Sequence, residues 1–86
     1  MDGIFKIEII SPDKIIFSSE ITEAIIPAFE GLMTILKDHI PLVTFLRPGI
    51  LEVISSKFNE KFFLTDGTVE FSNNKLLIGK IIKIRL

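Results

Sequence analysis

One histidine, His39, and four serines give this chain its few candidates for nucleophilic catalysis. Such catalysis needs a nucleophile hydrogen-bonded to a base that a third group orients in turn. Asp38 directly precedes His39, but neighbours on an extended segment point to opposite faces and cannot easily form that hydrogen bond. The candidate nucleophiles lie where turns or strand ends are expected: Ser18, Ser19, Ser55 and Ser56. The sequence therefore argues against an enzyme and predicts no catalytic residue.

Metal and nucleotide sites also lack the residues that they need. A metal site requires three or four converging ligands, and a chain with one histidine and no cysteine offers little besides carboxylates. Asp13, Glu20 and Glu23 lack the alternating spacing of a calcium loop. The five glycines form no loop that could cradle a phosphate. We therefore expect no cofactor, no metal, and no ATP binding by this chain alone.

The composition describes one small, neutral and rather apolar domain. Its 86 residues predict a single domain, 1–86, with 48% hydrophobic residues and a net charge of −1. A net charge of −1 does not indicate a basic surface that would bind nucleic acid. No run of apolar residues approaches the roughly 18 that a membrane span needs. No signal peptide is expected, because no basic cluster opens the chain. The basic last sixteen residues are either a solvated strand face or an edge facing an acidic partner or membrane surface.

Alternation of apolar and polar residues with a period of two predicts an all-β fold. Phe5, Ile7 and Ile9 would face one way, with Lys6 and Glu8 facing the other. Turn signals recur at short intervals, including Ser11-Pro12-Asp13, Ser18-Ser19, Arg47-Pro48-Gly49, Asp66-Gly67 and Asn73-Asn74. Strands are expected near 4–10, 14–18, 20–27, 32–36, 42–46, 49–56, 60–65, 68–71, 75–79 and 81–85. This pattern indicates a β-sandwich or barrel, and Pro41 breaks the best helical candidate.

Several expected strands are apolar on both faces, for example Ile25-Ile26 and Phe62-Phe63-Leu64. A free sandwich keeps its outer faces mostly polar. Such strands could lie at edges and corners where the chain changes sheets. Alternatively, a partner protein covers part of the outer surface, since contiguous exposed apolar patches usually mark interfaces.

The segment 30–49 concentrates the unusual residues of the chain. Glu30-Gly31 is interpreted as the opening of a loop, not as an acid–base site. His39 is either a histidine satisfied by hydrogen bonds beside Pro41 or an interface residue. Arg47, before Pro48-Gly49, is better interpreted as a solvated turn residue than as a salt-bridge anchor.

Four stretches of the chain resemble the N-terminal β-sandwich domain of the epsilon subunit of rotary F-type ATP synthases, called delta in mitochondria. They are Phe5-Lys6-Ile7-Glu8-Ile9-Ile10-Ser11-Pro12; Phe17-Ser18 with Ile25-Ile26-Pro27; Glu30-Gly31, Ile35-Leu36, His39, Pro41-Leu42-Val43 and Leu46-Arg47-Pro48-Gly49; and Phe62-Phe63-Leu64-Thr65-Asp66-Gly67 with Val69-Glu70-Phe71. The resemblance spans nearly the whole chain and implies a sandwich of about ten strands in two mostly antiparallel sheets.

The chain departs from the family pattern in loops and in length. Thr34 and Asp66 replace usual glycines, Lys37-Asp38 replaces a Pro-Gly or similar pair, and Leu32 replaces a common acidic residue. The usual polar contact of the loop at Leu32 with the c-ring is therefore not carried over. Family members usually continue into a helical hairpin, and no C-terminal helical hairpin is expected here, whether this shortness is natural or a truncation. Inhibition by that hairpin, and ATP binding to it, are not transferred.

The resemblance implies a non-catalytic central-stalk subunit that docks gamma to the c-ring and couples proton flow to ATP synthesis. By resemblance, the side towards gamma includes Ser11, His39, Pro41 and Thr44. The loop towards the c-ring would be Glu30, Gly31 and Leu32. The expected location is peripheral, on the cytoplasmic face of the bacterial inner membrane, or on an organellar inner or thylakoid membrane. Contact with the membrane would come only through the complex.

The alternative function is that of a ligand-binding or assembly β-sandwich from another family. A carbohydrate-binding module, for example, would present Trp or Tyr stacking groups on a concave face. The chain has neither residue, and its eight phenylalanines are interpreted as packing groups. The sequence therefore favours the stalk subunit.

Overall fold

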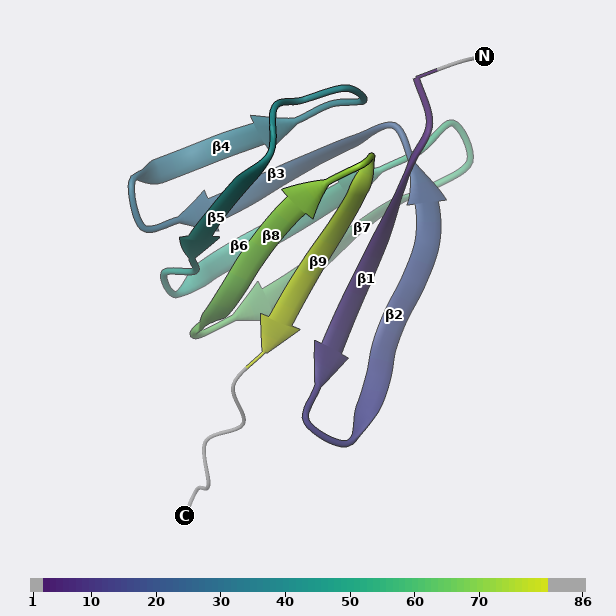
Figure 1. Ribbon diagram of the computed structural model, residues 1–86. Helices are drawn as coiled ribbons and strands as arrows, with labels where there is room; N and C mark the ends of the chain where they lie inside the picture. The colour runs from purple at the N-terminus through teal and green to yellow at the C-terminus, as the bar shows by residue number, and fades with distance from the viewer. Residues whose placement is uncertain (1–2, 81–86) are drawn as a thin grey trace.

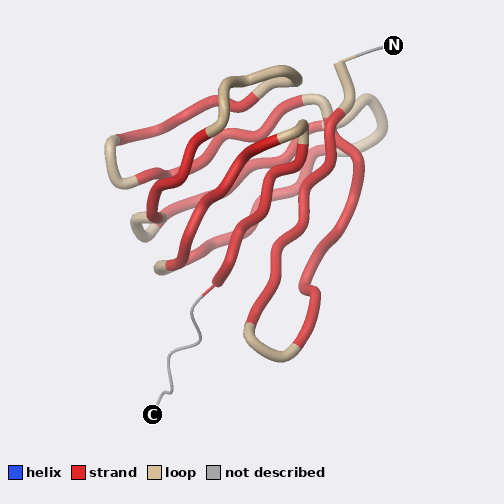
Figure 2. Tube along the Cα trace, in the orientation of Figure 1, coloured by secondary structure: helices blue, strands red, loops and turns tan. Residues whose placement is uncertain are grey.

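The computed structural model describes residues 3–80 as a sandwich of two β-sheets (Figure 1). One sheet has five strands in the order β2-β1-β9-β8-β5, and the other has four in the order β4-β3-β6-β7. Figure 2 shows strands and loops but no helix in this part of the chain. The strands are β1 (Phe5–Ser11), β2 (Lys14–Ile21), β3 (Glu23–Ala28), β4 (Gly31–Ile35), β5 (Leu42–Phe45), β6 (Gly49–Ile54), β7 (Asn59–Leu64), β8 (Gly67–Ser72) and β9 (Lys75–Lys80).

This architecture confirms the predicted all-β sandwich with mostly antiparallel sheets. Every strand pairing is antiparallel except β1 with β9, which lie parallel in the middle of the five-stranded sheet. The first and last described strands are therefore neighbours in space. Nine of the ten expected strands correspond to observed ones. The tenth, predicted at 81–85, lies outside the described residues.

The predicted turn at Ser18-Ser19 is wrong. Strand β2 runs through both serines to Ile21, because Ser18 and Ser19 pair with Glu8 and Ile7 of β1. The chain changes sheets at Thr22 instead. The Thr22 amide and hydroxyl both donate hydrogen bonds to the carbonyl oxygen of Ile54, at 2.8 and 3.1 Å. Ladder bonds to β1 therefore outweigh the turn preference of serine.

The inward-facing residues of both sheets form one core. Alternate residues of the central strands are buried, as the period of two predicted, and the five-stranded sheet contributes Ile7, Ile9, Val69, Phe71, Leu76 and Ile78. The opposite layer contributes Ala24, Ile26, Ile35, Leu51 and Val53. Phe5 meets Phe71 edge to face, with the ring centroids 5.7 Å apart. Full burial of each large side chain stabilises the fold by about 1.5–3 kcal/mol.

Gly79 on β9 supplies a test of the strand register. It lies opposite Thr68 on β8, and a Cβ atom added there would be 2.7 Å from the Thr68 Oγ1. We expect Gly79→Ala to lower the free energy of unfolding by about 1–2 kcal/mol, because the Thr68 side chain must move to make room for the new methyl group in a packed sheet. Urea denaturation measures the change. Thr68→Ala in the same chain should restore most of the loss, and a single Gly79→Ala variant with wild-type stability would contradict the register.

Candidate partner interface

The outer face of the four-stranded sheet carries a continuous apolar surface. We call it the apolar shelf, and it consists of Ile25, Leu32, Pro48, Ile50 and Phe63. Each strand of the sheet contributes one member, because the outward residues alternate with the core residues beneath them. A shallow hollow in the shelf is floored by Pro27 and flanked by Glu52 and Lys61. The structure thus confirms apolar residues on both faces of these strands.

A second apolar surface lies at the edge of the five-stranded sheet. We call it the β5 edge patch, and it consists of Phe29, Val43 and Phe45, all exposed. The Phe29 amide donates a 2.8 Å hydrogen bond to the Phe45 carbonyl, so the β3–β4 turn lies against the end of β5. The rest of this outer face includes polar residues, such as Lys75, whose Nζ is 3.5 Å from the Glu8 carboxylate. The β5 edge patch and the apolar shelf meet at the β3–β4 turn. This turn contributes Phe29 to the patch and is followed by Leu32 of the shelf.

Ser11 lies far from the other residues predicted to face gamma. Its side chain is buried at the end of β1, and its hydroxyl donates to the Asp13 carboxylate at 2.9 Å. His39 lies in the β4–β5 loop, at the opposite end of the five-stranded sheet (Figure 1). Ser11 therefore caps the β1–β2 hairpin, and any contact with a partner there would be separate from one at His39.

His39 is held by its own loop and by the core. The loop is not extended at this point, contrary to the sequence-based expectation, because Asp38 adopts a left-handed conformation with φ 68°. Asp38 and Asn74 exchange two hydrogen bonds, of 2.7 and 3.0 Å, which tie the loop to the β8–β9 turn. The His39 ring packs edge-on against Phe71 at 5.9 Å, and its Nδ1 lies 2.7 Å from the Ile40 carbonyl oxygen, to which a protonated Nδ1 donates.

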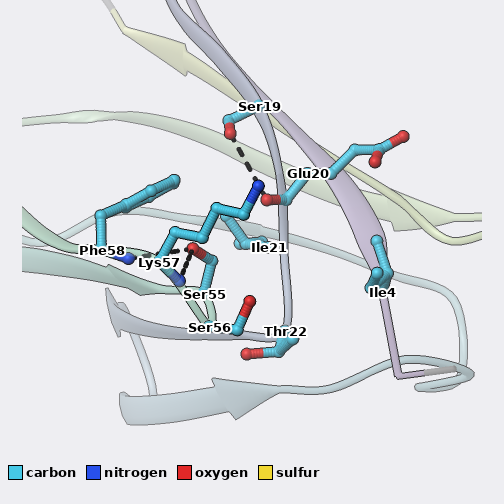
Figure 3. Close-up of a pocket in the computed structure, with 9 residues that line it drawn as sticks. All are labelled: Ile4, Ser19, Glu20, Ile21, Thr22, Ser55, Ser56, Lys57 and Phe58. Atoms are coloured by element: carbon cyan, nitrogen blue, oxygen red, sulfur yellow. Dashed lines mark hydrogen bonds between the residues drawn. The ribbon is translucent and has the colours of Figure 1, made fainter. Parts of the chain in front are cut away.

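Three of the four candidate serines gather around one hollow, far from the histidine. Figure 3 shows Ser19, Ser55 and Ser56 together with Lys57, which extends across the opening. The Ser55 hydroxyl accepts hydrogen bonds from the amides of Lys57 and Phe58, at 3.1 and 3.2 Å, and so serves the β6–β7 turn. Within residues 3–80 no hydrogen bond joins a serine hydroxyl to His39. The geometry therefore gives no support to a hydrolytic triad.

The structure brings together two residues that the resemblance assigned to different partners. Thr44 faces inward from β5, and its hydroxyl lies 2.9 and 3.0 Å from the two carboxylate oxygens of Glu30. Gly31 follows with φ +130° and opens β4, while Pro41 is exposed just before β5. The Thr44–Glu30 contact joins the two sheets across the open side of the sandwich. Sequence reasoning missed it, because no spacing rule relates residues in different sheets.

Other site types find no support in the described residues. No group of three His, Asp or Glu residues there could hold a metal ion. Arg47 is exposed and makes no ion pair with a described residue, as the solvated interpretation predicted. No helix long and apolar enough to cross a membrane occurs among them.

The described residues thus form a two-sheet β-sandwich with two exposed apolar surfaces. Residues 4–79 match the family model described as the β-sandwich domain of the ATP synthase delta/epsilon chain. The chain belongs to this ATP synthase delta/epsilon family, which confirms the resemblance seen in the sequence.

Two curated relatives illustrate the match. The ATP synthase epsilon chain of Pelagibacter ubique is 49% identical over 75 residues, which cover 86% of this chain and 58% of the relative. The ATP synthase epsilon chain of Chlorobium limicola is 37% identical over 78 residues, which cover 90% of this chain and 89% of the relative. The chain thus spans little more than half the length of several curated relatives that it matches.

Solved structures share the fold at low sequence identity. A chain in the Euglena gracilis mitochondrial ATP synthase, solved with its OSCP, F1 and c-ring, superposes with a TM-score of 0.85 at 21% identity. That match covers 98% of this chain and 54% of the other. A chain in the central stalk and c-ring of the Tetrahymena thermophila mitochondrial ATP synthase gives a TM-score of 0.71 at 16% identity, covering 90% and 63%.

Proposed function

We propose that this chain is a non-catalytic subunit of the central stalk of a rotary ATP synthase. It docks the gamma subunit to the c-ring and so couples proton flow to ATP synthesis. Residues 1–86 act as one domain in this role. The observation that carries the proposal is the pair of exposed apolar surfaces on a sandwich of the delta/epsilon family. Exposed apolar surface of this kind favours burial against another protein.

The residues assigned by resemblance divide between two contacts. Gamma covers Val43 and Phe45 of the β5 edge patch, Thr44 between them, and the neighbouring loop with His39 and Pro41, and Ser11 is a separate contact. The c-ring meets the turn formed by Glu30, Gly31 and Leu32. The apolar shelf, which starts at Leu32, adds a further area to be buried in the assembled stalk. A stable stalk interface buries on the order of 1,200–2,000 Å² in total.

The proposed location follows from the complex. The chain is peripheral to the membrane and reaches it only through its partners, on the cytoplasmic face of a bacterial inner membrane. Neither nucleic acid nor nucleotide takes part in its binding. The alternative, a ligand-binding sandwich from another family, has no observation in its favour.

Co-purification tests the proposed function. The tagged chain, co-expressed with gamma and the c-ring subunit of the same organism, should retain gamma through purification and recover c-ring in detergent. An untagged co-expression provides the background control. Recovery of the tagged, folded chain without gamma would overturn the proposal.

A further inference from the structure

The residues just before Glu30 are fixed by main-chain contacts to the end of strand β5 and to the two residues that follow it. The Phe29 amide donates to the Phe45 carbonyl, and the Arg47 amide donates to the Pro27 carbonyl, each at 2.8 Å. Ala28 and Leu46 form an antiparallel bridge between these two bonds. The turn therefore follows the end of β5 closely, and the Glu30 side chain lies within reach of that strand.

The Glu30 carboxylate is already engaged inside the chain. Thr44 is only 7% exposed, and its hydroxyl lies at hydrogen-bond distance from both carboxylate oxygens, at 2.9 and 3.0 Å. A hydroxyl carries one proton, so it donates to one oxygen at a time. Hydrogen bonds to an ionised acceptor are stronger than neutral ones. Glu30 is thereby oriented towards β5.

Glu30 is itself exposed, but its carboxylate is bonded to Thr44, and the other side chains that the turn presents outward are apolar. Phe29 is 68% exposed and Leu32 is 77% exposed, and Gly31 between them has no side chain. We propose that Glu30 is a positioning residue, held by Thr44, and that the turn meets its partner through Phe29 and Leu32. This inference rests on the proposed function, in which the turn faces the c-ring. This chain's side of the contact with the c-ring is then apolar, and Glu30 forms no ion pair there.

Two pairs of substitutions separate positioning from direct contact. Thr44→Val and Glu30→Ala each break the hydrogen bond, whereas Thr44→Ser keeps the donor and Glu30→Gln keeps an acceptor without the charge. We expect the two breaking variants to weaken binding to a purified gamma–c-ring complex roughly three- to tenfold, as expected for the loss of one hydrogen bond. The double breaking variant should be no weaker than either single one, because both remove the same interaction. The two conservative variants should stay within about threefold of wild type. Ser18→Ala, which removes an exposed hydroxyl on β2, is the control.

Leu32 tests the apolar contact itself. Leu32→Ser should weaken binding roughly tenfold or more, since it removes an apolar side chain from an interface. The control is Ile15→Ser, which changes another exposed aliphatic side chain on β2, at the other edge of the five-stranded sheet. The dependence of the affinity on NaCl concentration, measured by biolayer interferometry, should be nearly the same for Glu30→Gln as for wild type.

The outcomes distinguish this inference from the proposed function. If wild type binds and Glu30→Gln loses affinity as much as Glu30→Ala, with a weaker dependence on salt, then Glu30 contacts a basic partner group directly and the inference is overturned. Independent, additive effects of Thr44→Val and Glu30→Ala would overturn it as well. If the wild-type chain itself does not bind the gamma–c-ring complex, the proposed function fails.

Discussion

A chain carrying Val43→Asp and Phe45→Asp should bind gamma at least roughly a hundredfold more weakly than wild type. These two residues are the exposed members that β5 contributes to the edge patch, at 73% and 60% exposure. Burial against gamma would force two carboxylates into an apolar contact, where an unpaired charge is strongly unfavourable. Isothermal titration with purified gamma measures the loss.

The control places a single aspartate at an exposed apolar position of another strand. Ile15 on β2 is also 60% exposed but lies at the other edge of the five-stranded sheet. Ile15→Asp should leave the affinity for gamma within about threefold of wild type, as is usual for positions outside an interface. Circular dichroism should show both variants folded. Equal losses from the two strands would show that the β5 edge patch has no particular role in binding gamma.

Phe71→Ala should cost about 3–5 kcal/mol of unfolding free energy. The Phe71 ring is 2% exposed and contacts both Phe5 and His39 edge to face, so its removal leaves a cavity in the core and releases the β4–β5 loop. A domain of this size has a total stability of about 4–13 kcal/mol, so at the lower end of this range the variant would be largely unfolded. Urea denaturation with a fixed m-value gives the difference.

Phe63→Ala is the control for the core prediction. Phe63 is 64% exposed on β7 and belongs to the apolar shelf, so its removal should change the unfolding free energy by less than about 0.5 kcal/mol. The same variant should still be weakened in assembly, since the shelf is proposed to be buried there. Similar losses of stability from Phe71→Ala and Phe63→Ala would contradict the assignment of the core.

The fold could be predicted from the sequence because its determinants are local. Alternation of apolar and polar residues placed Phe5, Ile7 and Ile9 of β1 on one face, and all three are buried in the core. Asn73 and Asn74 form the β8–β9 turn with φ 51° and 56°, a conformation that asparagine tolerates well. The strand at Ser18-Ser19 was missed because ladder bonds to β1 are a tertiary effect.

The candidate site could be predicted only in part. Exposed apolar residues on the outer faces followed from strands that are hydrophobic at consecutive positions, such as Phe62-Phe63. The Thr44–Glu30 hydrogen bond and the packing of His39 on Phe71 join segments that approach only in the folded sandwich. The parallel pairing of β1 with β9 sets the five-stranded layer in which these segments sit, and no local signal encodes it.

Binding of this chain to the gamma subunit of the same organism is the most direct test of the central claim. Titration of purified gamma with the purified 86-residue chain, followed by calorimetry, gives the stoichiometry and the affinity. A stalk interface predicts a one-to-one complex with a Kd at or below about 1 μM, which corresponds to roughly −8 kcal/mol. No heat of binding at about 100 μM of each folded protein, where such a complex would be nearly saturated, would contradict the account.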